Sequence, residues 1–267
     1  MMNERQPVCA TPESARLLDY WDRRYQRFVL SESGWSGAGE LLNERIYACK
    51  LQALRQAIDQ LNLAPSFSVL DAGCGQGYFT RFYQQVYPST IYTGVDISSR
   101  VVEHLRATVP GARVEAGDLS RWRDSHGSLF DVIQAIDVFQ MILDDAFMTR
   151  VVTNLASQLT EGGALIATLA FPLETFEPAP YLRHRSRDHW TSLLASCGLT
   201  ITREAAIYYW LPAGGPRNKY ARYAFDRLGP TPLYLVDRAA LKLGVPQPAS
   251  SPIDNRTQLL TIQRMRM

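Results

Sequence analysis

The chain has 267 residues, 46% of them hydrophobic, and its 28 basic and 26 acidic residues leave a formal net charge of +2. This length suits one domain with additions, and the balanced charge gives no electrostatic case for nucleic acid or an anionic membrane surface as a partner. The four cysteines form no C-x-x-C pair and have no histidine at ligand spacing, so we expect neither a bound metal nor a disulfide framework. Without a signal peptide or an apolar stretch of about 20 residues, a cytoplasmic monomer or homodimer is expected.

Short apolar runs alternate with amphipathic stretches in the middle of the chain. The runs predict strands at 66–71, 91–95, 112–116, 130–136 and 164–170. Between them we expect helices at 80–87, after a cap at Ser98 or Ser99, and at 144–159, the last ended by Glu161-Gly162-Gly163. A helix at 187–196 and strands at 199–208 and 257–264 follow. Such alternation predicts an α/β fold, a Rossmann-like doubly wound sheet with helices on both faces.

Two segments flank or interrupt this predicted core. Residues 1–60 are expected to be an N-terminal helical cover. Residues 61–208 and 257–267 form the Rossmann-like core, and residues 209–256 are a helical insertion before the last strand, too long for a hairpin turn. The insertion could serve as a lid, a dimer contact or an additional covering of the core.

A glycine-rich loop follows the first predicted strand. Gly73, Gly75 and Gly77 are spaced G-x-G-x-G, and Asp71 precedes the first glycine by two positions. Glycines let a backbone turn sharply and approach a ligand closely. The dinucleotide fingerprint is G-x-G-x-x-G, and a phosphate-binding loop ends in Gly-Lys-Ser/Thr. Neither pattern is present, so the spacing disfavours both a dinucleotide site and a phosphate-binding loop.

Carboxylates stand at the ends of the next two predicted strands. Asp96 lies 19 residues after Gly77 (96 − 77) and can accept hydrogen bonds from both hydroxyls of a ribose. Asp118 can accept from an exocyclic adenine amine while Leu119 packs on the ring. Either aspartate alone could instead cap a helix, a role that Ser98 could fill after Asp96. Together with the glycine loop they lie where doubly wound sheets bind their ligands.

These three motifs resemble those of class I S-adenosylmethionine-dependent methyltransferases over about residues 60–205. The matching segments are Asp71-Ala72-Gly73-Cys74-Gly75-Gln76-Gly77, Val95-Asp96-Ile97, Gly117-Asp118-Leu119, Phe130-Asp131-Val132-Ile133 and Leu159-Thr160-Glu161-Gly162-Gly163-Ala164-Leu165. The resemblance implies S-adenosylmethionine as cofactor and methyl transfer to a small molecule, in the setting of specialised metabolism. The cofactor-binding residues it implies are Asp71, Gly73, Cys74, Gly75, Gly77, Asp96, Ile97, Gly117, Asp118, Leu119, Ala135 and Ile136.

The sequence gives fewer signals for the residues that contact the methyl acceptor. His184, His189 and Asp137 are candidates for a catalytic base, each with a plain structural role as the alternative. Where many relatives carry a histidine just after the fourth strand, this chain has Met141, which cannot act as a base. Tyr20 and Tyr25, with Trp21 between them, could offer an aromatic face to a sulfonium, or they could simply fasten the N-terminal helix to the core.

The balanced charge and the aromatic additions favour a small, partly apolar acceptor over a macromolecule. Asp137-Val138-Phe139-Gln140 also differs from the Asn/Asp-Pro-Pro-Tyr/Phe motif typical of nucleic-acid methyltransferases. Two alternatives remain. One is a relative of the fold that binds S-adenosylmethionine and catalyses a reaction other than methylation. The other is a nicotinamide-dependent oxidoreductase, which the glycine spacing disfavours.

Overall fold

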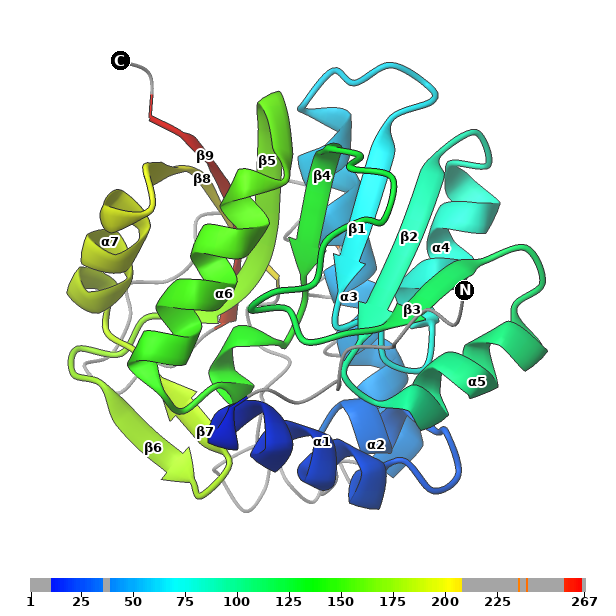
Figure 1. Ribbon diagram of the computed structural model, residues 1–267, viewed down its shortest axis with the longest axis horizontal. Coiled ribbons are helices and arrows are strands. Elements are labelled where there is room, and N and C mark those ends of the chain that lie inside the picture. Colours follow the sequence, from blue (N-terminus) through cyan, green and yellow to red (C-terminus); the bar gives the residue numbers. More distant parts are fainter. Residues whose placement is uncertain (1–10, 36–38, 208–234, 236–238, 240–256, 266–267) are drawn as a thin grey trace, which may run out of the picture.

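The computed structural model describes residues 11–35, 39–207, 235, 239 and 257–265. Its centre is a seven-stranded sheet in the order β3-β2-β1-β4-β5-β9-β8 (Figure 1). The strands are β1 (Ser68–Ala72), β2 (Ile91–Asp96), β3 (Arg113–Ala116), β4 (Phe130–Ala135), β5 (Leu159–Ala170), β8 (Leu199–Ala206) and β9 (Thr257–Arg264). The first five are mutually parallel, and β9 runs antiparallel to both β5 and β8. The doubly wound α/β sheet predicted from the sequence is confirmed.

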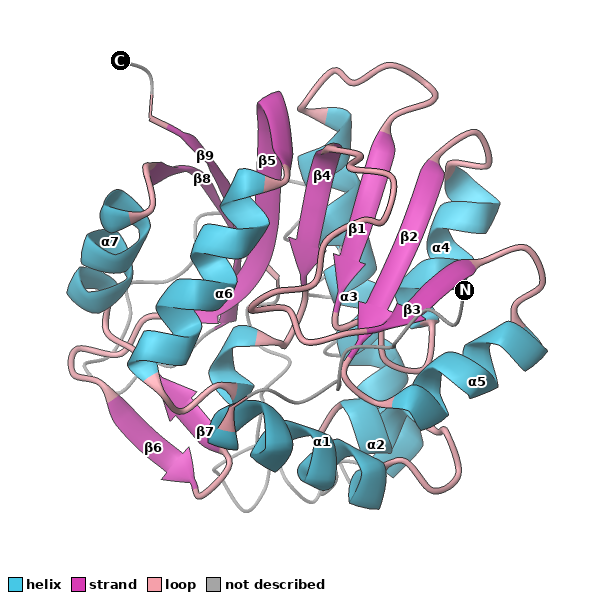
Figure 2. Ribbon diagram, viewed as in Figure 1, coloured by secondary structure: helices cyan, strands magenta, loops and turns pink. Residues whose placement is uncertain are grey.

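Helices cover both faces of the sheet (Figure 2). Helices α3 (Gly39–Asp59) and α4 (Tyr78–Val86) lie behind it in Figure 1, and α6 (Asp145–Ser157) and α7 (Arg187–Ser196) lie toward the viewer. Helix α5 (Ser99–Thr108) packs against β3 at the edge of the sheet. Buried side chains divide accordingly, because α3 and α4 share one hydrophobic cluster with the sheet, and α6 and α7 share another.

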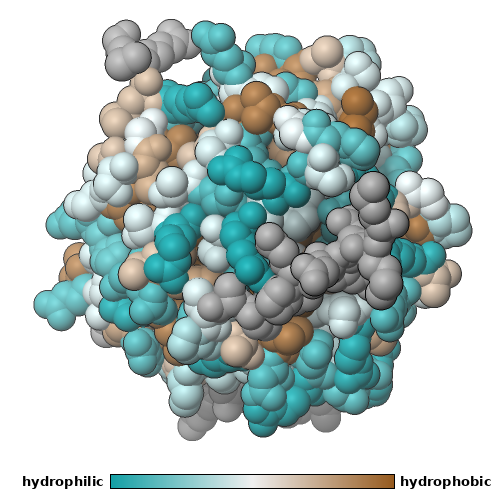
Figure 3. Space-filling view, in the orientation of Figure 1, coloured by the Kyte–Doolittle hydropathy of each residue, from teal (hydrophilic) through white to brown (hydrophobic). Residues whose placement is uncertain are grey.

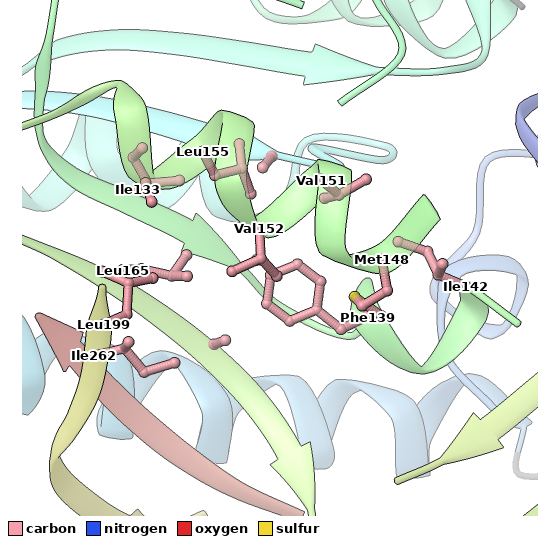
Figure 4. Close-up of a cluster of buried hydrophobic side chains, with 14 of the residues drawn as sticks. Ile133, Phe139, Ile142, Met148, Val151, Val152, Leu155, Leu165, Leu199 and Ile262 are labelled. Carbon is pink, nitrogen blue, oxygen red and sulfur yellow. The ribbon is translucent and has the colours of Figure 1, made fainter. Parts of the chain in front are cut away.

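The cluster beneath α6 shows how this packing arises. Apolar residues at helical spacing in α6, among them Met148, Val152 and Leu155, project onto side chains of β4, β5 and β9 such as Ile133 and Ile262 (Figure 4). All five are fully buried. Truncating a buried leucine of this kind typically costs about 2–5 kcal/mol, so this layer holds the parallel strands together and fixes their carboxyl ends.

One predicted boundary is wrong. Helix α6 ends at Ser157, and Glu161-Gly162-Gly163 lies inside β5, where we had expected it to end the helix. Strand β5 begins pairing with β4 at Leu159, and the register shifts before pairing resumes at Ala164. Gly162 absorbs the irregularity because it adopts φ 81°, a conformation that glycine takes without steric cost.

The N-terminal segment crosses the carboxyl ends of the strands. Helix α1 (Pro12–Arg24) begins with a capping box between Thr11 and Ser14, and the short α2 (Leu30–Ser33) follows it. In Figure 1 α1 lies at the edge of the sheet toward which the parallel strands point. Glu13 accepts a hydrogen bond from the backbone N–H of Leu143 at 2.7 Å, which fastens α1 to the loop before α6.

A small hairpin that the sequence did not predict, β6 (Phe176–Ala179) with β7 (Leu182–His184), lies beside α1 (Figure 1). The predicted insertion at 209–256 falls outside the described residues, apart from positions 235 and 239. In the part of the chain that is described, no helix is long and apolar enough to cross a membrane. On the face shown in Figure 3, hydrophobic side chains are scattered among hydrophilic ones and form no broad patch.

Candidate functional site

A cavity of about 850 Å³, including space open to solvent, lies between α1 and the carboxyl ends of β1, β2, β3 and β4. Residues from all three sequence motifs line it, together with aromatic side chains of α1, α3 and α4. The cavity therefore brings together segments that the sequence places far apart, at the edge of the sheet where doubly wound folds bind their ligands.

The glycine loop forms the floor of this cavity. Gly73 adopts φ 82°, and a Cβ built on it would lie 2.6 Å from Cγ2 of Val138. Its backbone N–H bonds the carbonyl of Val95 at 2.7 Å, so the loop folds tightly over the end of β2. Gly75 also has a positive φ, and its N–H donates to Asp96 Oδ2 at 2.9 Å. A larger residue at position 73 would separate this loop from the segment after β4.

Asp96 lies at the end of β2 and faces the cavity, with only 6% of its surface exposed. Its two oxygens accept backbone N–H bonds from Gly75 and, at 3.0 Å, from Ser98. Burial raises the pKa of Asp96 to about 6, although these hydrogen bonds oppose the rise. Ser98 caps helix α5 with its own side chain, so the carboxylate of Asp96 does not serve as the cap. Asp96 retains lone pairs that can accept further donors from a ligand.

Asp118 presents a buried oxygen with an unmet hydrogen-bonding capacity. Its Oδ1 accepts from the N–H of Ser120 at 2.9 Å, whereas Oδ2 has no partner among the described residues. A buried carboxylate oxygen without a donor is costly, which indicates that a ligand supplies one. No helix follows Asp118 within residues 113–135, all of them described, so helix capping does not explain it. The site thus fits an exocyclic amine here, beside Leu119 and Ile97, which also line the cavity.

Trp21 of α1 and Tyr25, which directly follows this helix, line the cavity on the side of the N-terminal segment. Tyr25 is 3% exposed and stacks on Trp21 with ring centroids 5.2 Å apart; both line the cavity. Tyr20 does not line it, because its ring stacks on Tyr181 of the β6–β7 turn at 5.1 Å. Tyr25 is therefore placed to face a ligand, and Tyr20 fastens α1 to the hairpin.

Comparison with known proteins agrees with this geometry. Residues 69–163 match a family model described as a methyltransferase domain. This match agrees with the methyltransferase motifs that the sequence resembles. Magnesium protoporphyrin IX methyltransferase from Synechocystis PCC 6803, solved with bound S-adenosylmethionine, superposes with a TM-score of 0.57 at 16% identity, covering 96% of this chain and 99% of that one. A methyltransferase from Leishmania major gives 0.62 at 13% identity, covering 94% and 82%. At these identities the likeness concerns the fold.

Among curated proteins, trans-aconitate 2-methyltransferase from Azoarcus sp. strain BH72 is 26% identical over 161 residues. That alignment covers 60% of this chain and 61% of the relative. The chain therefore spans less than two thirds of the relative's length in this match.

Asp137 is the third acidic residue among the described residues that line the cavity. It follows β4 with φ 60°, a conformation that non-glycine residues seldom adopt, and it lines the cavity. Its Oδ2 is ion-paired with Lys50 of α3, and its Oδ1 accepts a hydrogen bond from Thr168 Oγ1 at 3.1 Å. Thr168 Oγ1 also accepts the N–H of Asp137 at 2.7 Å. These contacts hold both the unusual backbone and the carboxylate in place.

Several residues implied by the resemblance lie just behind the cavity and do not line it. Asp71, Gly77 and Ala135 are in this group. Asp71 accepts a hydrogen bond from the hydroxyl of Tyr92 at 2.7 Å, and burial raises its pKa to about 6. Gly77 begins α4 with φ 79°. The remaining cofactor residues proposed from the sequence line the cavity, namely Gly73, Cys74, Gly75, Asp96, Ile97, Gly117, Asp118, Leu119, Ile136 and Tyr25.

Neither candidate histidine is among the residues that line the cavity. His184 ends β7, where its ring stacks on Phe176 with centroids 5.7 Å apart. His189 lies in the first turn of α7, with its Nε2 3.7 Å from Oδ1 of Asp145. Burial lowers the pKa of both imidazoles. Of the three proposed bases, Asp137 alone lines the cavity as described.

Sequence reasoning missed Lys50 and Tyr47, one turn apart on α3. Lys50 is 6% exposed, and its ammonium lies 4.8 Å from the centre of the Tyr47 ring, which lines the cavity. Burial, with the nearby charge of Asp137, raises the pKa of Tyr47 well above its usual value. The available signal was that Lys50 is one of only three lysines in an arginine-rich chain and falls within a largely apolar helix.

Proposed function

We propose that the protein transfers a methyl group from S-adenosylmethionine to a small-molecule acceptor. The unpartnered, buried Oδ2 of Asp118 carries this proposal, because it needs a donor and lies after the strand next to the one that ends at Asp96, as an adenine amine beside a bound ribose would require. Asp96 ends β2 and pairs in register with Ala116, the last residue of β3, and Asp118 follows two positions later.

The cofactor brings an activated methyl group on a positively charged sulfur, so the protein's own contribution is positioning and exclusion of water. Asp96 binds the ribose hydroxyls, and Asp118 with Leu119 binds the adenine. Tyr25 and Trp21 present stacked rings to the cation, an attraction worth about 2 kcal/mol in a desolvated site. Helix α1 shields this arrangement from solvent.

The acceptor binds next to Asp137, at the end of β4 beyond the glycine loop. We propose Asp137 for contact with the acceptor, ahead of His184 and His189, because the cavity is lined by the aspartate and by neither histidine. Trans-aconitate, named in the relatives, is a tricarboxylate and would need several cationic partners. Among the described residues that line the cavity, the charged side chains are Asp96, Asp118 and Asp137, all acidic. We therefore propose a different acceptor.

Calorimetric titration with S-adenosylhomocysteine, the demethylated product, tests the proposed cofactor. We expect micromolar binding in the wild type and a loss of about 1–3 kcal/mol of binding free energy in Asp118→Ala, because a charge-assisted hydrogen bond is removed. Asp131→Ala, at the start of β4 and away from the cavity, serves as the control. A folded wild type that fails to bind S-adenosylhomocysteine but changes the fluorescence of reduced nicotinamide on titration would replace this proposal with the oxidoreductase alternative.

A further inference from the structure

Where we place the acceptor, aromatic rings and the carboxylate of Asp137 line the cavity together. The residues that bind this carboxylate, Lys50 and Thr168, do not line the cavity. Tyr47, Tyr78 and Phe79 supply rings from α3 and α4, and Asp137 supplies the carboxylate. The side chain of Asp137 is 17% exposed, whereas that of its ion-pair partner Lys50 is 7% exposed. Thr168, the other partner, is fully buried. The open side of the carboxylate is therefore the side that faces the cavity.

The protein uses only part of the accepting capacity of this carboxylate. An ionised carboxylate offers about four lone-pair positions, and Lys50 and Thr168 each take one. The remaining positions can accept a hydrogen bond but cannot donate one. A ligand that meets them must bring an O–H or N–H group, and a second carboxylate placed there would be repelled.

The charge of Lys50 decides which ligand groups the pair can bind. Its positive charge balances Asp137, so the two together add no net charge to the wall. A fixed carboxylate without net local charge selects for a hydrogen-bond donor more than for a cation. The positive φ of Asp137, maintained through the two hydrogen bonds with Thr168, directs the side chain back toward Lys50.

We infer that Asp137 binds the reacting group of the acceptor, that Lys50 and Thr168 are its positioning residues, and that the site takes a hydroxyl or amine on an apolar body and rejects polycarboxylates. This inference rests on the proposed methyltransferase function and names the class of acceptor for it. Lys50 does not line the cavity, so it acts on the acceptor through Asp137.

Three matched probes test the inference by calorimetric titration into protein already saturated with S-adenosylhomocysteine. Phenol has a donor, anisole has the same ring without one, and benzoate carries a negative charge. We expect phenol to bind roughly tenfold more tightly than anisole, as a hydrogen bond to a charged group allows, and benzoate to bind most weakly. Asp137→Asn should remove most of the preference for phenol and leave the affinity for S-adenosylhomocysteine unchanged.

Substitutions of Lys50 separate positioning from simple support of the fold. Lys50→Met should reduce the ratio of phenol to anisole affinity, and Lys50→Arg, which keeps the charge, should restore it. Arg55→Met is the control, since Arg55 is an exposed cation on the same helix. A Lys50→Met protein that keeps the full ratio, or one that Lys50→Arg does not rescue, would remove Lys50 from the inference.

The remaining outcomes are also decisive. Equal affinities for phenol and anisole, no binding of phenol, or benzoate binding as tightly as phenol would overturn the assignment of the acceptor class. A large fall in S-adenosylhomocysteine affinity in Asp137→Asn, with the phenol preference intact once the variant is saturated at a higher ligand concentration, would assign Asp137 to the cofactor. If the wild type binds no S-adenosylhomocysteine at all, the proposed function itself fails, and that result is distinct from each of the others.

Discussion

The hydroxyl of Ser98 donates a hydrogen bond to Asp22 Oδ1 across 2.5 Å and thereby joins helix α1 to the loop after β2. Arg100 adds a second link, from its guanidinium to the carbonyl of Asp22 at 3.0 Å. Asp96 directly precedes this loop, Trp21 lies in α1, and Tyr25 directly follows α1. Opposite walls of the cavity are thus held together by this contact.

Asp22→Ala should weaken the attachment of α1. We expect the free energy of unfolding to fall by about 1–2 kcal/mol, because a hydrogen bond to a charged group is lost, and the affinity for S-adenosylhomocysteine to fall as well. Urea unfolding and calorimetry measure the two effects. Asp19→Ala is the matched control, since Asp19 is exposed on the same helix and pairs only at the surface with Arg23. Equal losses in both variants would contradict a specific role for Asp22.

The buried carboxylate of Asp96 should make ligand affinity depend on pH. Burial raises its pKa to about 6, and hydroxyl donors from a ribose favour the ionised form. Binding therefore releases a proton below pH 6, so the affinity for S-adenosylhomocysteine should rise as pH increases toward 6 and level off above it. Titrations from pH 5 to pH 8 measure this.

Asp96→Asn should abolish that rise and weaken binding at pH 7.5 by about 1–3 kcal/mol. The matched control is Asp71→Asn, because the pKa of Asp71 is also about 6 but this residue does not line the cavity. If the pH dependence of affinity persisted in Asp96→Asn and disappeared in Asp71→Asn, the titrating group would be Asp71 and not Asp96.

The contributions of Lys50 and Asp137 to the free energy of unfolding should be strongly coupled. Removing one partner leaves a mostly buried charge uncompensated, so Lys50→Met and Asp137→Asn should each lower the free energy of unfolding by about 2–4 kcal/mol. The double variant should recover much of this loss. Chemical unfolding of all four proteins gives the coupling energy.

The pair formed by Arg55 and Asp59 provides the comparison, since it lies exposed on the same helix. Its cycle should yield less than about 1 kcal/mol of coupling. If the two cycles gave equal values, the Lys50–Asp137 pair would be no more than an ordinary surface ion pair.

Replacing glycine by alanine should lower the free energy of unfolding by different amounts at Gly73, in the glycine loop, and at Gly111, outside it. Gly73 and Gly111 both have a positive φ, but a Cβ on Gly73 would meet Val138 at 2.6 Å, whereas nothing lies within 4 Å of one on Gly111. Gly111→Ala should cost about 1–2 kcal/mol for the backbone alone. Gly73→Ala should cost a further 1–3 kcal/mol, roughly, for the steric clash.

Combining Gly73→Ala with Val138→Ala tests the source of that extra cost. The double variant should regain part of the loss, because the clash is relieved while the backbone strain remains. Thermal unfolding of the set measures this. Equal costs at positions 73 and 111 would show that the loop does not press against Val138.

Much of the fold followed from local patterns, because β1 and β4 are almost entirely buried and β1, β2 and β3 end at or just before Gly73, Asp96 and Gly117. The predicted helix at 187–196 and strand at 257–264 have the observed bounds. Asp96 and Asp118 could be proposed for the same reason, since a strand end fixes where its next side chain lies. The glycines at 162 and 163 misled the prediction, because pairing with β4 outweighed their local tendency to end a helix.

The acceptor end could not be predicted in this way. Lys50 and Asp137 are 87 positions apart in the sequence, and nothing local indicates that α3 delivers an ammonium group to the end of β4. The positions of His184 and His189 likewise depend on a hairpin whose strands are four and three residues long. Contacts of this kind arise from the packing of whole elements, which periodicity does not specify.

The position of β9 has a consequence for the order in which the sheet can assemble. This strand lies between β5 and β8, although it follows both in the chain. Until residues 257–264 have left the ribosome, β5 retains an unpaired edge and β8 has no neighbour in the sheet. Pairing over such a sequence separation is slow, and open edges invite association with other chains. Of the edges that the finished sheet closes, the β5 edge is therefore the one that stays open longest during synthesis.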